Sequence, residues 1–328
     1  MRITILFGGT NKERLVSVAS AQALQEALPE ADLWFWDVSD TVHEVRSQAL
    51  RSHARPFEDP FKSGNRGIGL EPALDKAMAE DRLLVLALHG GRAENGELQA
   101  MCEMRGIPFT GSGSASSHLA FDKVAAKRFA AIAGVKAPIG LMLEDIDAAL
   151  ATYGKLIAKP ARDGSSYGLI FVNAKQDLVA VRNAAKTEEY VIEPFISGVE
   201  ATCGVLEQSD GSVIALPPIE IVPADGGFDY TAKYLLKSTQ EICPGRFAPE
   251  ITAQIMDQAL KAHQALSCSG YSRTDFIISE NGPVYLETNT LPGLTKASLY
   301  PKSLKVQGIE FADFLLGQVD LAKKRTQR

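Results

Sequence analysis

The chain has 328 residues, which suits two or three packed units at roughly 100–200 residues per domain and excludes one small domain. Apolar residues make up 45% and charged residues 23%, as in ordinary globular proteins, so the composition excludes a disordered chain or a fibre. The net charge of -6 would repel a polyanion, and the only basic cluster lies at residues 323–325, so we expect no nucleic-acid partner.

The cysteine pattern and the start of the chain bear on location. Cys102, Cys203, Cys243 and Cys268 lie far apart and form no CxxC pair, so neither a zinc site nor a disulfide framework is predicted. The chain opens with a strand pattern instead of a basic and apolar leader, and no apolar run approaches about 18 residues. We therefore expect a cytoplasmic protein with reduced thiols and no membrane contact.

The first third of the chain predicts an open α/β sheet. A strand at residues 2–7 is followed by Gly8-Gly9 and by a segment at 13–28 with near-helical apolar spacing. Residues 32–38 predict a second strand, and 83–88 form the continuous apolar run of a parallel strand buried on both faces. Residues 52–65 contain Pro56 and Pro60 and little periodicity, which predicts a surface excursion.

The rest of the chain predicts a small antiparallel unit and a larger one. A helix is expected at 122–133, and strands at 155–159 and 169–173 flank a Gly/Ser turn. Further strands are expected at 190–193, 201–206 and 214–221, and a helix at 251–267. A hairpin follows, with strands at 275–278 and 284–287 joined by Glu280-Asn281-Gly282.

The end of this hairpin carries the strongest chemical signal. Glu287 and Asn289 lie two residues apart on one strand and share a face, and Asp275 can lie across from them. Three oxygen ligands without His or Cys suit a hard cation such as Mg²⁺, which usually shares substrate phosphates. A solvated strand end would show the same residues, so the motif alone leaves both interpretations open.

Four further segments gain meaning only in company. The segment KPARDGSSYG from Lys159 places a lysine, glycines and hydroxyls after a strand, where backbone N–H groups can surround phosphate oxygens; the alternative is a mobile hairpin tip. It is neither a Walker sequence nor GxGxxG. Glu193 and Glu200 flank a turn, and Lys233 and Tyr234 lie in a polar loop, as ordinary surface residues also do. His89 leaves the apolar strand at its carboxyl end, where ligands of open α/β sheets bind.

In this order, the segments resemble the D-alanine:D-alanine ligases of the ATP-grasp superfamily, over residues 8–301. The resemblance rests on FGGTNKERLVS from Phe7, LHGGRAENGELQ from Leu88, IPFTGSG from Ile107, DKVAAK from Asp122 and NTLPGLT from Asn289, followed by Ser298-Leu299. It implies an α/β (α+β) ATP-grasp fold with an N-terminal open parallel sheet domain at 1–112, a central domain at 113–192 and a C-terminal domain at 193–328, the last two sandwiching ATP.

The resemblance also implies a ligase that joins two D-alanine molecules through a D-alanyl phosphate, in a homodimer that serves peptidoglycan synthesis. Lys123 and Lys159 would hold the ATP phosphates, with Lys233, Ser165 and Ser166 closing over them, and Glu193 and Glu200 would take the adenine amine and the ribose. Asp275, Glu287 and Asn289 would carry two Mg²⁺ or Mn²⁺. For the substrates, Glu13 would bind the first ammonium, His89 would contact substrate, and Ser298 with the Leu299 backbone would hold the second carboxylate. Arg273 and the Gly293 N–H would stabilise the oxyanion, and Tyr234 would link with Glu13 and Ser165.

Departures and competing interpretations remain. Asn95 stands where the family commonly has Asp, and Lys296-Ala297 replaces a variable pair beside the second pocket, so another acid and amine pair is the alternative substrate set. Tyr234, where depsipeptide-forming relatives have phenylalanine, favours an amine acceptor over D-lactate. A non-catalytic relative predicts loss of residues that are present here, and a NAD-dependent oxidoreductase predicts a glycine pattern that is incomplete here.

Overall fold

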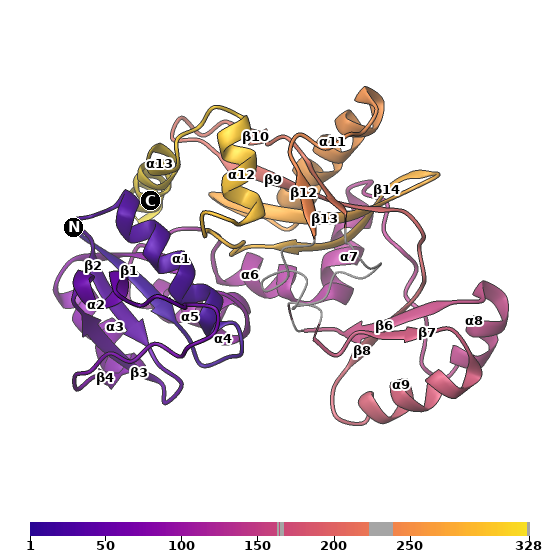
Figure 1. Cartoon of the computed structure of the whole chain (residues 1–328), viewed down its shortest axis with the longest axis horizontal. Coiled ribbons are helices and arrows are strands. Elements are labelled where there is room, and N and C mark those ends of the chain that lie inside the picture. The colour runs from indigo at the N-terminus through magenta and orange to yellow at the C-terminus, as the bar shows by residue number, and fades with distance from the viewer. Residues whose placement is uncertain (163, 165–166, 223–238, 327–328) are drawn as a thin grey trace.

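The structure is a computed structural model, and it describes residues 1–328 apart from 163, 165–166, 223–238 and 327–328. Within these residues, three β-sheets follow one another along the chain, as Figure 1 shows. None of the helices in the described part of the chain has the length and the apolar character that crossing a bilayer requires.

The first sheet has the strand order β4, β3, β2, β1, β5. Its strands are β1 (Arg2–Gly8), β2 (Asp32–Trp36), β3 (Thr41–Val45), β4 (Ile68–Gly69) and β5 (Arg82–Ala87). The central strand β1 pairs in parallel with β2 and β5, as their buried apolar runs predict, whereas β3 and β4 extend the edge antiparallel. The associated helices are α1 (Arg14–Ala27), α2 (Ser47–Arg51), α3 (Leu70–Ala79), α4 (Gly91–Glu94), α5 (Glu97–Glu103), α6 (Ser114–Phe121) and α7 (Lys123–Ile132).

The second sheet is small and antiparallel, with the order β7, β6, β8. It consists of β6 (Leu156–Pro160), β7 (Ile170–Val172) and β8 (Tyr190–Pro194), and it packs with α8 (Ile146–Tyr153), the 3₁₀ turn η1 (Lys175–Asp177) and α9 (Leu178–Ala184) around its own apolar cluster. Figure 1 places this unit at the lower right. The boundary expected between residues 192 and 193 falls inside β8, so Glu193 belongs to the small sheet.

The third sheet has the order β12, β11, β9, β13, β14, with β10 paired to β9. Its elements are β9 (Val199–Glu207), β10 (Val213–Ala215), β11 (Ile219–Val222), β12 (Gln240–Ile242), β13 (Tyr271–Ser279) and β14 (Gly282–Asn289), with α11 (Pro249–Ala265), α12 (Leu299–Val306) and α13 (Phe311–Thr326). The single strand expected at 214–221 is wrong. Pro217 and Pro218 lie between β10 and β11, and because proline lacks a backbone N–H it interrupts a ladder.

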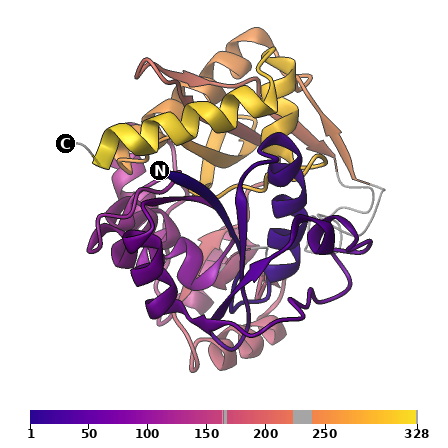
Figure 2. The same ribbon diagram turned by 90° about the vertical axis from the view of Figure 1, so that its left-hand side faces the viewer.

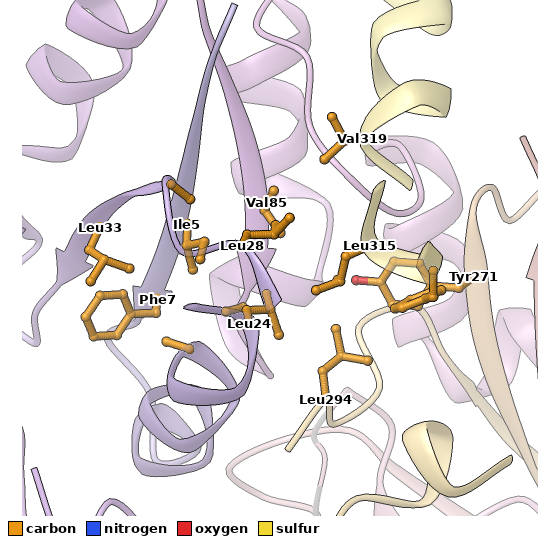
Figure 3. Packing of buried hydrophobic residues seen from close by; sticks show 14 of the residues in the cluster. Ile5, Phe7, Leu24, Leu28, Leu33, Val85, Tyr271, Leu294, Leu315 and Val319 are labelled. Carbon is orange, nitrogen blue, oxygen red and sulfur yellow. The ribbon is translucent and has the colours of Figure 1, made fainter. Parts of the chain in front are cut away.

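One apolar core joins the first sheet to the C-terminal helices. Figure 3 shows Ile5 and Val85 of the first sheet with Leu24 of α1, and Leu315 and Val319 of α13 continuing the same cluster. Figure 2 shows α13 running beside the N-terminal unit, and α13 contacts both α1 and β5. The first sheet and the third sheet are therefore fixed to each other by shared burial.

The expected surface excursion at 52–65 is partly wrong. The segment forms no helix or strand, but Phe61 is buried and packs edge-on against Phe35, with ring centroids 5.0 Å apart. It also meets Phe7 at 5.7 Å. The absence of periodicity correctly predicted irregular backbone, yet one aromatic side chain anchors the segment to the core.

Candidate active site

A cavity of about 1190 Å³ is lined by strand residues of the second and third sheets and by residues that follow β1 and β5 of the first sheet. Every predicted site residue that the structure describes lines it: Glu13, His89, Lys123, Lys159, Glu193, Glu200, Arg273, Asp275, Glu287, Asn289, Gly293, Ser298 and Leu299. The remaining predicted residues, Ser165, Ser166, Lys233 and Tyr234, lie outside the described residues. Segments far apart in sequence therefore converge on one site.

The loops that leave β1 and β5 are fastened together at one end of this cavity. Asn11 donates from Nδ2 to the carbonyl of His89 at 2.7 Å, and its Oδ1 accepts from the Glu13 N–H at 2.7 Å. Gly90 adopts φ +64°, and a Cβ added there would lie 2.0 Å from Glu13 Oε2. The Glu13 carboxylate thus packs directly on a backbone that only glycine leaves open.

His89 connects β5 to the loop after β14. Its Nδ1 lies 2.9 Å from the Leu291 carbonyl, and its Nε2 lies 2.9 Å from Ser20 Oγ. A carbonyl only accepts, so Nδ1 carries the proton and Nε2 accepts from the Ser20 hydroxyl. Burial lowers the pKa of His89 to about 4, so the ring is neutral near pH 7. Both ring nitrogens have protein partners, while the ring also lines the cavity.

Glu94 is a cavity acid to which the sequence analysis gave no role. At the end of α4 it accepts from the Gly90 N–H at 3.0 Å and from the Leu291 N–H at 3.4 Å. Burial, and then the negative charge of Glu13, raise the pKa of Glu94 to about 7. The signal that could have found it is its place in a glycine-rich segment after a buried parallel strand, where ligands of such sheets bind.

Helix α7 carries two lysines that pair with two different glutamates. Asp122 caps its first turn, and its Oδ1 accepts from two backbone N–H groups at 3.0 Å. Lys123 and Lys127, four residues apart, share the buried face of the helix. Lys123 Nζ lies 3.5 Å from Glu287 Oε2, and Lys127 pairs with the buried Glu193.

Glu193 has a second cationic neighbour. Lys159 Nζ lies 3.5 Å from Glu193 Oε2, opposite the contact that Lys127 makes with Oε1. Burial, and then the positive charge of Lys159, lower the pKa of Lys127 to about 7, although the negative charge of Glu193 opposes this. Lys127 received no role from the sequence, because a lysine on an amphipathic helix is usually solvated.

The hairpin brings the predicted oxygen ligands together. Asp275 pairs with Glu287 and Arg273 with Asn289 in the register of β13 and β14. The Arg273 guanidinium donates to both Asp275 oxygens at 2.9 and 2.8 Å, and Asn289 Nδ2 donates to Asp275 Oδ2 at 3.2 Å. The described residues contain no group of three His, Cys, Asp or Glu placed to hold a metal, so the predicted set depends on the Asn289 amide as its third ligand.

The loop before α12 forms the far wall. Ser298 Oγ accepts from the Thr295 N–H at 3.2 Å and lies 2.7 Å from Thr295 Oγ1. A Cβ on Gly293 would lie 2.8 Å from Ser298 Oγ, so the backbone of Gly293 runs directly against this hydroxyl. Lys296 pairs with Glu26 of α1 at 2.5 Å. Ser298 therefore stands at the N-terminus of a helix, where unpaired N–H groups favour a carboxylate.

Solved structures share the arrangement of the whole chain. It superposes on the VanG D-Ala:D-Ser ligase from Enterococcus faecalis with a TM-score of 0.78 and 31% identity, covering 98% of this chain and 99% of that one. With the D-alanine–D-alanine ligase from Bacillus anthracis complexed with ATP, the TM-score is 0.76 and the identity 27%, covering 100% and 98%. The fold is the ATP-grasp fold, as the family resemblance implied.

Sequence comparisons narrow this class. The family profiles described as D-ala D-ala ligase N-terminus and C-terminus match residues 2–112 and 144–319. The D-alanine–D-alanine ligase of Nitrosomonas europaea is 34% identical, covering 98% of this chain and 97% of its own. That of Halalkalibacterium halodurans is also 34% identical, covering 99% and 100%. The chain belongs to the D-alanine–D-alanine ligase family, so the resemblance is confirmed.

Proposed function

We propose that this protein joins two D-alanine molecules to D-alanyl-D-alanine through a D-alanyl phosphate, releasing ADP and phosphate for peptidoglycan precursor synthesis. The observation that carries the proposal is the convergence of two lysines, three side chains with oxygen atoms and Arg273 in one cavity of a chain from this family. Glu13 and His89, which line the cavity, follow the carboxyl ends of the parallel strands β1 and β5, where substrates of such sheets bind.

In the first step, a D-alanine carboxylate oxygen attacks the γ-phosphorus of ATP, and ADP leaves. Lys123 and Lys159 supply positive charge at the cavity wall, which such a transfer needs more than it needs a nucleophilic side chain. Glu193 and Glu200 would take the adenine amine and the ribose hydroxyls. The predicted contributions of Ser165, Ser166 and Lys233 belong to the same step and stay predictions.

The ligand set at the hairpin fits a hard divalent cation. Asp275, Glu287 and Asn289 offer oxygen atoms from paired strands at the partly exposed wall of the cavity. We propose that these residues hold two Mg²⁺ or Mn²⁺. When bound, such ions neutralise charge on the transferring phosphoryl group.

In the second step, the amine of the second D-alanine attacks the carbonyl carbon of the acyl phosphate, and phosphate leaves. Glu13 would hold the ammonium of the first D-alanine, and Ser298 with the Leu299 backbone would hold the carboxylate of the second. Arg273 and the Gly293 N–H would stabilise the oxyanion of the tetrahedral intermediate. Tyr234, predicted to link with Glu13, stays a prediction.

The test is coupled phosphate release from MgATP with D-alanine, L-alanine, D-alanine plus D-serine, and D-alanine plus D-lactate. Mass spectrometry identifies each product. D-alanine-dependent phosphate release with D-alanyl-D-alanine formed supports the proposal. A D-alanyl-D-serine product, as the name of the Enterococcus faecalis relative suggests, would change the proposed acceptor from D-alanine to D-serine. The cavity wall that contains Ala297 would then be examined as the source of that preference. No stimulation by any D-amino acid would contradict it.

The proposal includes the expected organisation of the protein. A three-domain organisation, a cytoplasmic location and a homodimer belong with it. Size-exclusion chromatography with light scattering would give the mass in solution. A mass of one chain, 35.3 kDa, would contradict the dimer.

A further inference from the structure

A buried lysine, Lys127, contacts the cavity acid Glu193 but does not line the cavity itself. Among the described residues, those that line the cavity include Glu193 and Lys159 but not Lys127. Lys127 comes from α7, is 7% exposed, and reaches Glu193 Oε1 from behind the cavity wall. It therefore contacts the acid at the wall without reaching the space that a ligand would fill.

We propose that Lys127 is a positioning residue that holds the Glu193 carboxylate in place as a hydrogen-bond acceptor, so that the pocket selects a 6-amino purine over a 6-oxo purine. This inference rests on the adenine-binding role proposed for Glu193. It adds a specificity determinant that lies outside the cavity wall.

Two positive charges flank the buried Glu193 carboxylate. Glu193 is 2% exposed, and an ionised carboxylate buried this deeply needs a compensating charge. In this structure it has two, because Lys159 Nζ lies 3.5 Å from Oε2 while Lys127 pairs with Oε1. Glu193 is thus held between two ammonium groups that arrive from different elements.

A bound nucleotide would affect the two lysines beside Glu193 differently. Lys159 lines the cavity and is proposed to bind phosphate, so a triphosphate would draw its ammonium group away from Glu193. Lys127 lies behind the wall and has no such alternative, so it remains the partner of the acid. The positive charge of Lys159 helps to lower the pKa of Lys127, and its departure favours the ammonium form of Lys127.

Hydrogen-bond donors and acceptors at Glu193 and at position 6 of the purine determine which base fits. An ionised carboxylate only accepts hydrogen bonds, whereas a protonated one can also donate. Glu193 beside Lys127 therefore matches the amino group at position 6 of adenine and repels the oxygen at position 6 of hypoxanthine. Without Lys127, Glu193 would have no fixed cationic partner once Lys159 turns to phosphate, and its carboxylate would no longer be held as an acceptor for the 6-amino group.

The experiment measures the dissociation constants of MgATP and MgITP by titration calorimetry without D-alanine. Wild-type protein should prefer MgATP, and Lys127→Met should reduce the ITP/ATP ratio of dissociation constants at least about tenfold, since hydrogen bonds to charged groups discriminate on that scale. Lys127→Arg, which keeps the charge, should restore most of the ratio. The KM for D-alanine should stay at its wild-type value in every variant of Lys127.

The matched control is Arg128→Met, which removes a cation from the next, exposed position of α7 and should leave the ratio unchanged. A double-mutant cycle with Glu193→Gln separates charge control from packing. The effect of Lys127→Met on the ratio should vanish in the Glu193→Gln background, because an amide can accept from one purine and donate to the other. If Lys127→Met does not fold, Lys127→Gln replaces it with the same expected direction.

A wild-type protein that binds both nucleotides equally, or a Lys127→Met variant with the wild-type ratio, would overturn the inference. An equal effect of Lys127→Met in both Glu193 backgrounds would also overturn it, since the lysine would then act through packing. If the ligase proposal is wrong, the protein would still select between the two nucleotides but would form no D-alanyl-D-alanine. Dipeptide formation with an unchanged ratio would leave the ligase proposal intact and remove only the role of Lys127.

Discussion

Replacing Gly90 with alanine tests whether Glu13 is held in place by the loop after β5. The new Cβ would lie 2.0 Å from Glu13 Oε2, whereas ordinary contact begins at 3.4 Å, so the carboxylate oxygen must move by about 1.4 Å. A displacement of about 1 Å in a substrate-positioning group can cost about 10²-fold in rate. We expect kcat/KM for D-alanine to fall by that order in coupled phosphate-release kinetics, while MgATP binding stays unchanged.

The matched control is Gly106→Ala. Gly106 has φ +65°, almost the φ of +64° at Gly90, but a Cβ there meets nothing within 4 Å. Both variants should lose about 1–2 kcal/mol in the free energy of unfolding from left-handed backbone, as measured by urea denaturation. Only Gly90→Ala should lose activity. Equal kcat/KM values for D-alanine in the two variants would refute the reasoning that backbone contact positions Glu13.

Three further predictions concern the rest of the cavity. Arg273→Lys keeps a cation but loses the fork that holds Asp275, so kcat should fall about 10²–10³-fold in steady-state assays. The KM for the acceptor D-alanine should be about tenfold higher in Ser298→Ala than in wild type, because one hydrogen-bonding group is lost. An equal KM would remove Ser298 from the second pocket. Burial raises the pKa of Glu94 from 4.5 to about 7, so the folded chain holds this proton more tightly than the unfolded chain. The stability of wild type relative to Glu94→Gln should therefore fall as pH rises from 4.5 to about 7, by at most ~3 kcal/mol and less if cavity water screens the charge. Urea denaturation at several pH values measures it, and a flat difference would contradict it.

The parallel part of the first sheet was predictable because burial on both faces leaves a continuous apolar run. Residues 83–88 carry such a run, and the structure buries all of them. Periodicity failed where a local rule competed with it. Apolar residues at 214–221 suggested one strand, but Pro217-Pro218 divides the segment into two. Phe61 shows the converse case, in which a segment without periodicity still contributes an aromatic side chain to the core.

Cavity residues could be predicted where a sequence motif fixes both the residue type and its place on the backbone, as in the hairpin. The hairpin alternation put Asp275 opposite Glu287, and the strand register confirms it. Glu94 and Lys127 received no role for a common reason. Their chemistry depends on burial produced by the tertiary fold, and nothing in an isolated Glu or a helical Lys shows that burial. His89 was left open between ligand and core, and it lines the cavity while both ring nitrogens bind protein groups.

Three cationic side chains of the cavity are already paired with acids before any ligand arrives. Lys123 pairs with Glu287, Lys159 with Glu193, and Arg273 with Asp275. A triphosphate that entered without a cation would draw the two lysines away and leave Glu287 facing negative charge, which is unfavourable in a desolvated site. A triphosphate accompanied by a divalent cation brings both signs, so lysines and carboxylates exchange partners with no net loss of compensation. On our proposal Lys127 stays with Glu193 throughout, so Lys159 can turn to phosphate without leaving this buried acid unpaired.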